Sequence, residues 1–197
     1  ASGARLDRDR WAWVDVEGGM SRALPEAERR TDDAYYTPDA LAEALVGLLP
    51  IVGAGCWEPH AGGGAFVRAL EQRSGRSVVA TDINGWGASL DFLTVCNPPP
   101  GTSWVVGNPP FRGHEQHIDK ALSLVPNVAF LLRLAVMESA ARAPMWKRWP
   151  LRRVHVLAER PSFTGGGTDS AAYGFFWWER GYTGPAEVVP GWSWRAP

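Results

Sequence analysis

The sequence has few cysteines, no long apolar run and almost no net charge, and each shortage excludes a class of protein. Two cysteines, Cys56 and Cys96, cannot form the disulfide framework of a small secreted protein. A transmembrane helix needs about 20 apolar residues in a row, so we expect no membrane span. The polar first ten residues do not resemble a secretory signal. We therefore expect a reduced, cytoplasmic protein.

Lysine is also scarce, and arginine supplies nearly every positive charge. The formal net charge is −1, whereas a protein that holds duplex DNA through phosphate contacts alone is usually more basic. Residues 133–160 are an exception, because seven basic and two acidic residues give that segment a local charge of +5. This segment is either a solvated surface or a phosphate-facing patch, and the sequence leaves both interpretations open.

From residue 37 onward, short apolar runs alternate with stretches of helical periodicity. The apolar runs that end at turns predict strands at 55–58, 77–81, 104–106, 128–134 and 153–157. Residues 172–178 and 187–189 are expected to form a terminal antiparallel pair. Helical spacing predicts helices at 37–49, 65–72, 114–124 and 137–146, the first with Thr37 as its cap.

This alternation predicts an α/β protein with a mostly parallel sheet and helices on both faces. Residues 1–34 are polar and irregular, and we interpret them as an N-terminal extension. Residues 35–197 are expected to form a single domain, since that length suits one full apolar core.

A glycine-rich turn, residues 59–64, joins the first predicted strand to the next helix, which is a nucleotide-binding layout. A phosphate loop would continue with Gly-Lys-Ser/Thr, and a dinucleotide fingerprint would need a third glycine at position 67, which is Val. Asp82 ends the second strand, where a carboxylate accepts hydrogen bonds from ribose hydroxyls. Glu58 would repel a pyrophosphate but attract the amino group of S-adenosylmethionine. Glu58 therefore favours a methyl donor, unless it only caps the turn.

The segment Asn108-Pro109-Pro110-Phe111 follows the third strand, at the edge of the sheet where ligands bind in this architecture. The amine of adenine is a poor nucleophile because its lone pair is delocalised into the ring. Two rigid acceptors on its N–H bonds, the Asn108 side-chain oxygen and the Pro109 carbonyl, would favour the form that attacks a methyl group. Pro110 fixes the loop, and Phe111 offers a ring face to an extruded base. We predict these four as the catalytic residues, with no metal ion required.

Five segments occur in the order found in class I N6-adenine DNA methyltransferases: Tyr35–Pro38, Glu58–Gly64, Asp82–Asn84, Asp91–Phe92 and Asn108–Phe111. The chain resembles that family over roughly residues 33–180, and more narrowly the small enzymes of phages and prophages. The resemblance implies a Rossmann-like class I methyltransferase fold with a mostly parallel seven-stranded sheet. It also implies S-adenosylmethionine as cofactor and DNA as substrate, with RNA as the alternative, in a bacterial or phage-infected cell.

The resemblance also implies roles by position. Cofactor contacts are expected from Tyr36, Thr37, Pro38, Glu58, Ala61, Gly62, Gly64, Asp82, Ile83, Asp91, Phe92 and Asn108. Among these, Asp82 would hold the ribose, Ile83 would pack on the adenine of the cofactor, and Asp91 would accept from the amine of that adenine. Acceptor contacts are expected from Phe111, Arg112, Arg133, Arg148 and Phe163.

A separate target-recognition domain is not expected, since fewer than 90 residues follow Asn108. We therefore predict weak or short-site specificity, with the loops at 112–117, 140–153 and 165–169 reading the target. The tetrapeptide also resembles those of protein-glutamine and RNA methyltransferases, so both stay as alternatives. A cofactor-binding module without catalysis is an alternative of another class.

Histidine and tryptophan complete the set of candidates. His114 and His117 are three residues apart, not the four of a zinc-protease helix, so we interpret them as a solvated helix start. His60 and His155 are expected to be structural. Tryptophans within predicted strands are expected in the core: Trp57, Trp104, Trp177 and Trp178. Tryptophans among Arg and Pro are expected to cover core edges rather than to stack on bases: Trp146, Trp149, Trp192 and Trp194.

Overall fold

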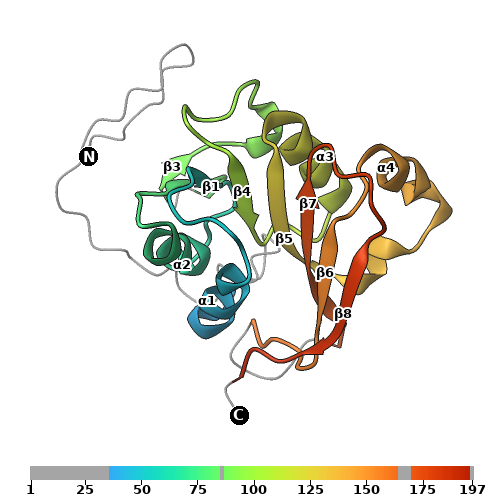
Figure 1. Ribbon diagram of the computed structural model, residues 1–197. Helices are drawn as coiled ribbons and strands as arrows, with labels where there is room; N and C mark the ends of the chain where they lie inside the picture. Colours follow the sequence, from blue (N-terminus) through green and yellow to red (C-terminus); the bar gives the residue numbers. More distant parts are fainter. Residues whose placement is uncertain (1–35, 85–86, 164–169, 196–197) are drawn as a thin grey trace.

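The computed structural model describes residues 36–84, 87–163 and 170–195. The predicted N-terminal extension, residues 1–34, lies outside the described residues, as do Tyr35 and the loop at 165–169. Within the described chain, a twisted central sheet has helices packed on both of its faces (Figure 1).

The sheet has eight strands in the order β3-β2-β1-β4-β5-β7-β6-β8. Their bounds are β1 Cys56–Glu58, β2 Val79–Asp82, β3 Ala88–Ser89, β4 Trp104–Gly107, β5 Asn127–Arg133, β6 Arg153–Leu157, β7 Tyr173–Glu179 and β8 Glu187–Trp192. Neighbouring strands are parallel except where β7 pairs with β5 and β6. The predicted mostly parallel sheet is confirmed, and the two-residue strand β3 adds an eighth strand at one edge.

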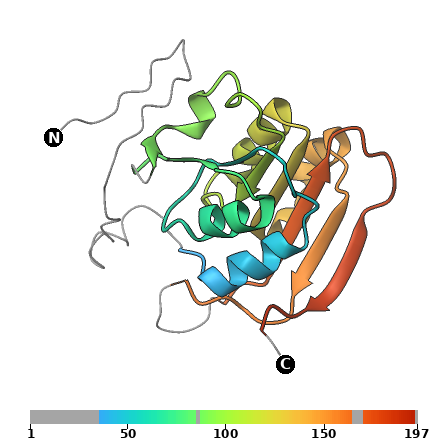
Figure 2. The ribbon, with the colours of Figure 1, turned by 60° about the vertical axis from the view of Figure 1, so that its left-hand side comes forward.

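Each face of the sheet carries its own core. Helices α1 (Asp39–Gly47) and α2 (Ala65–Ser74) cover one face, and α3 (His114–Leu124) and α4 (Ala143–Arg148) cover the other (Figure 2). Strand β5 serves both cores, because successive side chains of a strand point to opposite faces: Ala129 and Leu131 join one, and Phe130 and Leu132 the other. Among the described helices, none has the length and apolarity needed to cross a membrane.

The two C-terminal strands pair differently from the prediction. β7 lies between β5 and β6, and β8 pairs in parallel with β6, so the predicted antiparallel pair of β7 and β8 is wrong. β7 is buried along most of its length and therefore needs a neighbour on each side. β8 is largely exposed and contains Pro190 and Gly191. Proline cannot donate to a strand ladder and is typical of edge strands.

Two local predictions also change. In place of one helix at 137–146, the chain forms two 3-10 turns, η3 (Leu134–Met137) and η4 (Ala140–Arg142), followed by the short helix α4. Helix α1 has Pro38 at its N-cap position and no side-chain cap. Thr37 is therefore not the cap, and its hydroxyl has another partner in the site described below.

The tryptophans take the predicted places. Trp57, Trp104 and Trp178 are buried in the sheet, and Trp177 on β7 is partly buried against the same core. The other four predicted positions pack against the edges of the two cores: Trp146, Trp149, Trp192 and Trp194. This placement confirms edge cover as their structural role.

Candidate active site

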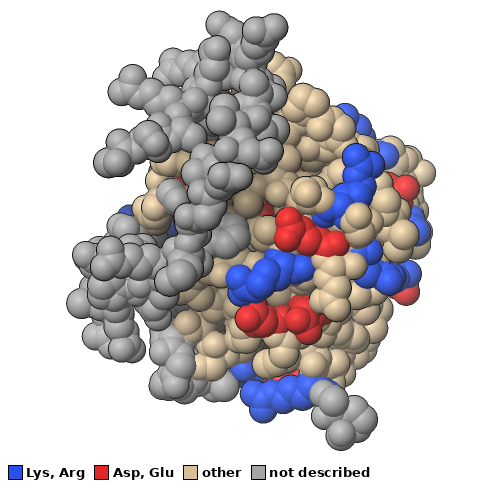
Figure 3. All heavy atoms as spheres, turned by 90° about the vertical axis from the view of Figure 1, so that its left-hand side faces the viewer, with Lys and Arg blue, Asp and Glu red and all other residues tan. Residues whose placement is uncertain are grey.

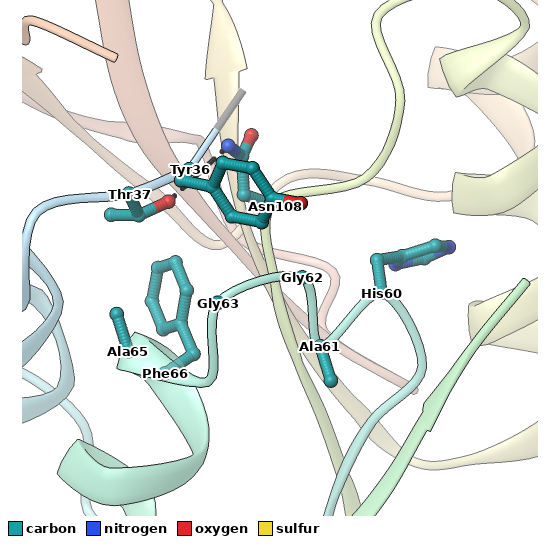
Figure 4. Close-up of a pocket in the computed structure, with 9 residues that line it drawn as sticks. All are labelled: Tyr36, Thr37, His60, Ala61, Gly62, Gly63, Ala65, Phe66 and Asn108. Atoms are coloured by element: carbon teal, nitrogen blue, oxygen red, sulfur yellow. Dashed lines mark hydrogen bonds between the residues drawn. The ribbon is translucent and has the colours of Figure 1, made fainter. Parts of the chain in front are cut away.

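The predicted motifs meet at the carboxyl ends of β1 and β4, which are hydrogen-bonded neighbours. A small pocket lies there, and three separate segments line it with Tyr36, Thr37, His60, Ala61, Gly62, Gly63, Ala65, Phe66 and Asn108 (Figure 4). The strand order reverses between β1 and β4. The pocket therefore occupies the switch point at which open α/β sheets bind ligands.

The turn after β1 depends on its glycines. Gly62 and Gly64 have φ angles of 50° and 79°, in the left-handed region that favours glycine. A Cβ atom on Gly63 would lie 3.0 Å from ring atom Cδ1 of Tyr36. The bare glycine backbone thus lets the Tyr36 ring lie across the turn (Figure 4).

The Asp82 carboxylate fastens this turn to the end of β2. Its Oδ2 accepts the Gly62 N–H at 2.9 Å, and its Oδ1 accepts the Asn84 N–H at 2.8 Å. Ile83, the next residue, is 65% exposed. An acceptor and an open apolar surface therefore adjoin at this end of the turn.

The other two residues expected near the adenine of the cofactor differ in exposure. Asp91 is exposed, and it accepts the Leu93 N–H at 3.0 Å and so caps the 3-10 turn η2 (Phe92–Thr94). Phe92 is 2% exposed and packs edge-on against His60, with ring centroids 5.2 Å apart. Phe92 therefore supports His60, which lines the pocket.

Glu58, at the end of β1, is 1% exposed, and its Oε1 accepts the His60 N–H at 2.8 Å. A Cβ atom on Gly107 would lie 2.1 Å from both carboxylate oxygens of Glu58, so the carboxyl group fills the space that this glycine leaves. Burial raises the pKa of Glu58 well above its usual range, the His60 hydrogen bond lowers it, and the charge of Asp82 raises it. The sequence did not indicate Gly107, because its role arises from the packing of β1 against β4.

Two histidines join the turn to helix α3. His60 Nε2 and His117 Nδ1 are 2.8 Å apart, within hydrogen-bonding distance. His117 is 9% exposed, so its predicted place on a solvated helix start is wrong: the ring points inward and stacks on Phe92. Burial lowers the pKa of His117 to about 4 and also holds the pKa of His60 well below its usual range.

The tetrapeptide that the sequence predicts to be catalytic, residues 108–111, follows β4 directly. Asn108 Nδ2 donates to the Thr37 hydroxyl at 3.3 Å, which brings the segment before α1 to the loop. Pro109 is buried. The Phe111 carbonyl accepts from His114 Nδ1 at 2.7 Å, in the first turn of α3. The loop is therefore tied at both ends.

Phe111 belongs to a cluster of three rings, with Phe163 and Tyr173 at centroid distances of 6.2 and 5.7 Å. The guanidinium of Arg133 lies over the Phe111 ring, 4.2 Å from its centroid. Arg133 Nε also donates to the Tyr173 hydroxyl at 3.2 Å. The structure thus brings three predicted acceptor residues together and adds Tyr173, which the sequence did not indicate.

The two other predicted acceptor residues lie outside this cluster of contacts. Arg112 is exposed directly after Phe111. Arg148 forms an ion pair with Asp119 of α3, 3.3 Å apart, and lies over the Trp149 ring. Arg148 therefore has partners beside α3 and α4.

The basic segment at 133–160 is largely neutralised. Four of its arginines pair with acidic side chains: Arg142–Glu115, Arg148–Asp119, Arg152–Glu179 and Arg153–Glu187. These ion pairs favour the interpretation of the segment as a solvated surface. Figure 3 shows a different face of the molecule, the left-hand side of Figure 1, where described positive and negative side chains also lie next to one another.

Known proteins match the chain in structure rather than in sequence. No protein-family model matches it, and no curated protein does. A Listeria monocytogenes protein proposed to be a class I S-adenosylmethionine-dependent methyltransferase is 14% identical, with a TM-score of 0.64 over 85% of this chain and 69% of its own. The methyltransferase subunit of a Streptococcus thermophilus type I restriction-modification system is 14% identical. Its TM-score is 0.60, and the match covers 80% of this chain and 47% of the subunit.

A further match is the 23S rRNA methyltransferase ErmE, 16% identical, with a TM-score of 0.55 over 76% of this chain and 71% of its own. The chain thus spans about half the length of the type I subunit it matches. Similarity at this level of identity establishes architecture, so the protein has the Rossmann-like fold of the class I methyltransferases.

Proposed function

We propose that this protein transfers a methyl group from S-adenosylmethionine to the N6 amine of adenine in DNA. The observation that carries the proposal is the place of Asn108. This side chain lines the same pocket as the glycine turn, and three residues later Phe111 enters the ring cluster beneath Arg133. A cofactor-type turn and an amine-binding loop that opens on aromatic rings therefore share one site.

The residues around the turn fit S-adenosylmethionine by their chemistry. Carboxylates end both β1 and β2, as Glu58 and Asp82, and no lysine is among the residues that line the pocket. Such a set suits an amino group and a ribose better than a pyrophosphate. Tyr36, Gly62 and Ile83 would complete the contacts, and the bound cofactor would supply an electrophilic methyl group on its sulfonium.

The protein's own contribution is to hold the amine. Asn108 and Pro109 would supply the oxygen acceptors from a loop tied to Thr37 at one end and to His114 at the other. Acceptors fixed before the amine arrives stabilise charge that develops on it during transfer, without reorganising at that moment. No general base with a raised affinity for protons is needed at this position.

The ring cluster supports a nucleobase as the acceptor. Phe111 and Phe163 offer aromatic surface, and aromatic side chains bind unstacked bases. The guanidinium of Arg133 adds a positive charge beside them. DNA rather than RNA is our choice because Phe occupies position 111, as in the N6-adenine DNA enzymes that the chain resembles.

We further propose weak or short-site specificity. After Asn108, the described chain supplies four of the eight strands and the helices α3 and α4, so these residues belong to the fold itself. Contacts from loops such as the one that carries Arg112 would then select the target.

The direct test is transfer of labelled methyl groups from S-adenosylmethionine to unmethylated DNA, to RNA and to bulk protein in parallel. We expect label in DNA, recovered as N6-methyladenine after digestion. Asn108→Ala should lower turnover by roughly 10²–10³-fold, the usual loss for a preorganised group, with binding of S-adenosylhomocysteine retained.

The other outcomes are equally informative. Label in RNA or in glutamine side chains would replace DNA as the substrate while leaving the amine chemistry in place. Binding of the cofactor with no transfer to any acceptor would identify a non-catalytic module. Full activity in Asn108→Ala would refute the role of the loop.

A further inference from the structure

The histidine bond between the cofactor turn and helix α3 has no part in the function proposed above. His60 lies in the turn after β1, and His117 lies in α3, 57 residues later in the chain. Their nitrogens are 2.8 Å apart in a partly buried environment. A hydrogen bond of this kind constrains the two elements it joins, because breaking it leaves polar atoms with little access to water.

Helix α3 is also the direct continuation of the catalytic loop. Gly113 precedes it with a φ of 71°, and His114, in its first turn, hydrogen-bonds to the Phe111 carbonyl at 2.7 Å. His117 lies one turn further along the same helix. The first turn of α3 therefore holds the catalytic loop through one histidine and the cofactor turn through another.

The side chains around His60 and His117 hold the two rings in this hydrogen-bonded arrangement. Phe92 stacks on His117 and packs edge-on against His60, so the rings have little freedom to rotate. The charged or titratable groups that face the pair are Glu58, 4.0 Å from His60 Nδ1, Asp91 of the η2 segment, and His114 of α3. Burial keeps the pKa of both rings below their usual range, so that at neutral pH one neutral ring donates to the other.

We propose that His117 is a positioning residue, which transmits the state of the cofactor turn to the catalytic loop through its bond to His60. This inference rests on the proposed function. With cofactor in the turn, the tether holds α3 and the loop in place, and the acceptors of Asn108 and Pro109 are set before the amine arrives. If the tether forms better with cofactor in the turn than without it, the two sites are coupled in binding.

The test is hydrogen exchange measured by mass spectrometry, with and without S-adenosylhomocysteine. In the wild-type protein, the ligand is expected to slow exchange both at residues 59–67 and at residues 111–118. His117→Phe keeps the ring that stacks on Phe92 but removes the nitrogen. In that variant, the ligand should still protect 59–67, while protection of 111–118 falls by about tenfold, within the usual range of coupling between sites.

Two further variants separate positioning from loss of packing. His117→Asn places an amide near the position of Nδ1 and should restore protection of 111–118, together with kcat. Lys120→Ala, on the same helix, should behave as the wild type in both measurements. Equal protection of 111–118 in wild type and His117→Phe, or its loss in Lys120→Ala, overturns the inference. Failure of the wild type to bind S-adenosylhomocysteine overturns the proposed function, and the inference with it.

Discussion

The two sides of the site are built from different groups. The proposed cofactor side, residues 58–64 and Asp82, is held by backbone N–H groups, glycines and a buried carboxylate. The proposed acceptor side, Phe111, Arg133, Phe163 and Tyr173, is held by ring contacts and one guanidinium. A backbone turn leaves little room for adjustment, whereas side chains can change rotamer. On our proposal, the cofactor side would suit one ligand, and the acceptor side would suit nucleotides in varied sequence contexts.

Gly107 lies against Glu58 of the proposed cofactor side and directly precedes the loop at 108–111, so its replacement should have the largest effect. In Gly107→Ala, the new Cβ would lie 2.1 Å from both oxygens of Glu58, and the displaced carboxyl group would disturb the turn and the loop together. We expect loss of methyl transfer and a fall of about 1–3 kcal/mol in the free energy of unfolding, as for other overpacked cores. The methyl-transfer assay measures the loss of activity, and chemical denaturation measures the free energy of unfolding.

The matched control is Gly47→Ala in α1, where a Cβ would meet nothing within 4 Å. This variant should retain both activity and stability. A Gly107→Ala protein with normal activity would mean that Glu58 has room to move.

Phe111→Ala should damage the acceptor side alone. The ring that faces Arg133, Phe163 and Tyr173 would be lost, and aromatic stacking is worth about 1–3 kcal/mol per base. We expect kcat/KM for DNA to fall by about 10–100-fold, with the affinity for S-adenosylhomocysteine within twofold of the wild type. Phe111→Tyr should keep most of the activity. Loss of cofactor binding in Phe111→Ala would contradict the division of the site into two sides.

Glu58→Gln should damage the cofactor side while stabilising the fold. Because the pKa of Glu58 is raised in the folded protein, its protonated form favours folding at low pH, and this contribution is lost as pH rises through the raised pKa. A neutral glutamine avoids that loss, so the variant should be more stable by about 1 kcal/mol at neutral pH. The difference should shrink toward zero below pH 4.5, the ordinary value for the group.

The same substitution should weaken binding of S-adenosylhomocysteine by about tenfold, since a hydrogen bond between charged groups, here with the amino group of the ligand, is worth about 1.5–3 kcal/mol. Calorimetry at several pH values measures both effects. A variant that is less stable than the wild type at pH 8 would show that the carboxylate is ionised and paired in the fold.

Arg133→Lys should have the smallest effect of the four. Lysine keeps the positive charge but loses the flat guanidinium over Phe111 and the Nε bond to Tyr173. We expect KM for DNA to rise a few-fold with kcat unchanged, since a cation–π contact at a partly exposed site is worth about 0.5–1 kcal/mol. Arg133→Leu should raise KM further. Equal KM values in wild type and Arg133→Leu would remove this residue from the acceptor side.

The strands that carry the site were predictable because their apolar runs end in turns. Asn108 lies just after the apolar run at 104–106, and Asp82 directly follows the run at 77–81. The carboxyl ends of parallel strands share one edge of the sheet. That rule alone placed the cofactor turn and the catalytic loop together. The neighbours of β8 were not predictable, because strand pairing depends on which surfaces remain to be covered once the core has formed.

Within the site, the histidines also separate what the sequence predicts from what depends on tertiary packing. His60 and His117 have no spacing that marks them as partners, since a hydrogen bond between residues 57 apart follows from the packing of α3 beside the turn. Gly107 looks like any other glycine until β1 and β4 are paired. Tyr173 joins Phe111 and Arg133 only because β7 lies antiparallel beside β5, with Arg133 opposite Tyr173 in the register.

The sequence by itself determined the α/β class, the turn at 59–64 and the loop at 108–111, because periodicity and turn chemistry are local properties. The tertiary structure decided which side chains complete the site: Gly107 against Glu58, His117 against His60, and Tyr173 with Arg133 over Phe111. These contacts join residues far apart in the chain, and their free energy depends on burial, which exists only once the sheet and its helices are in place.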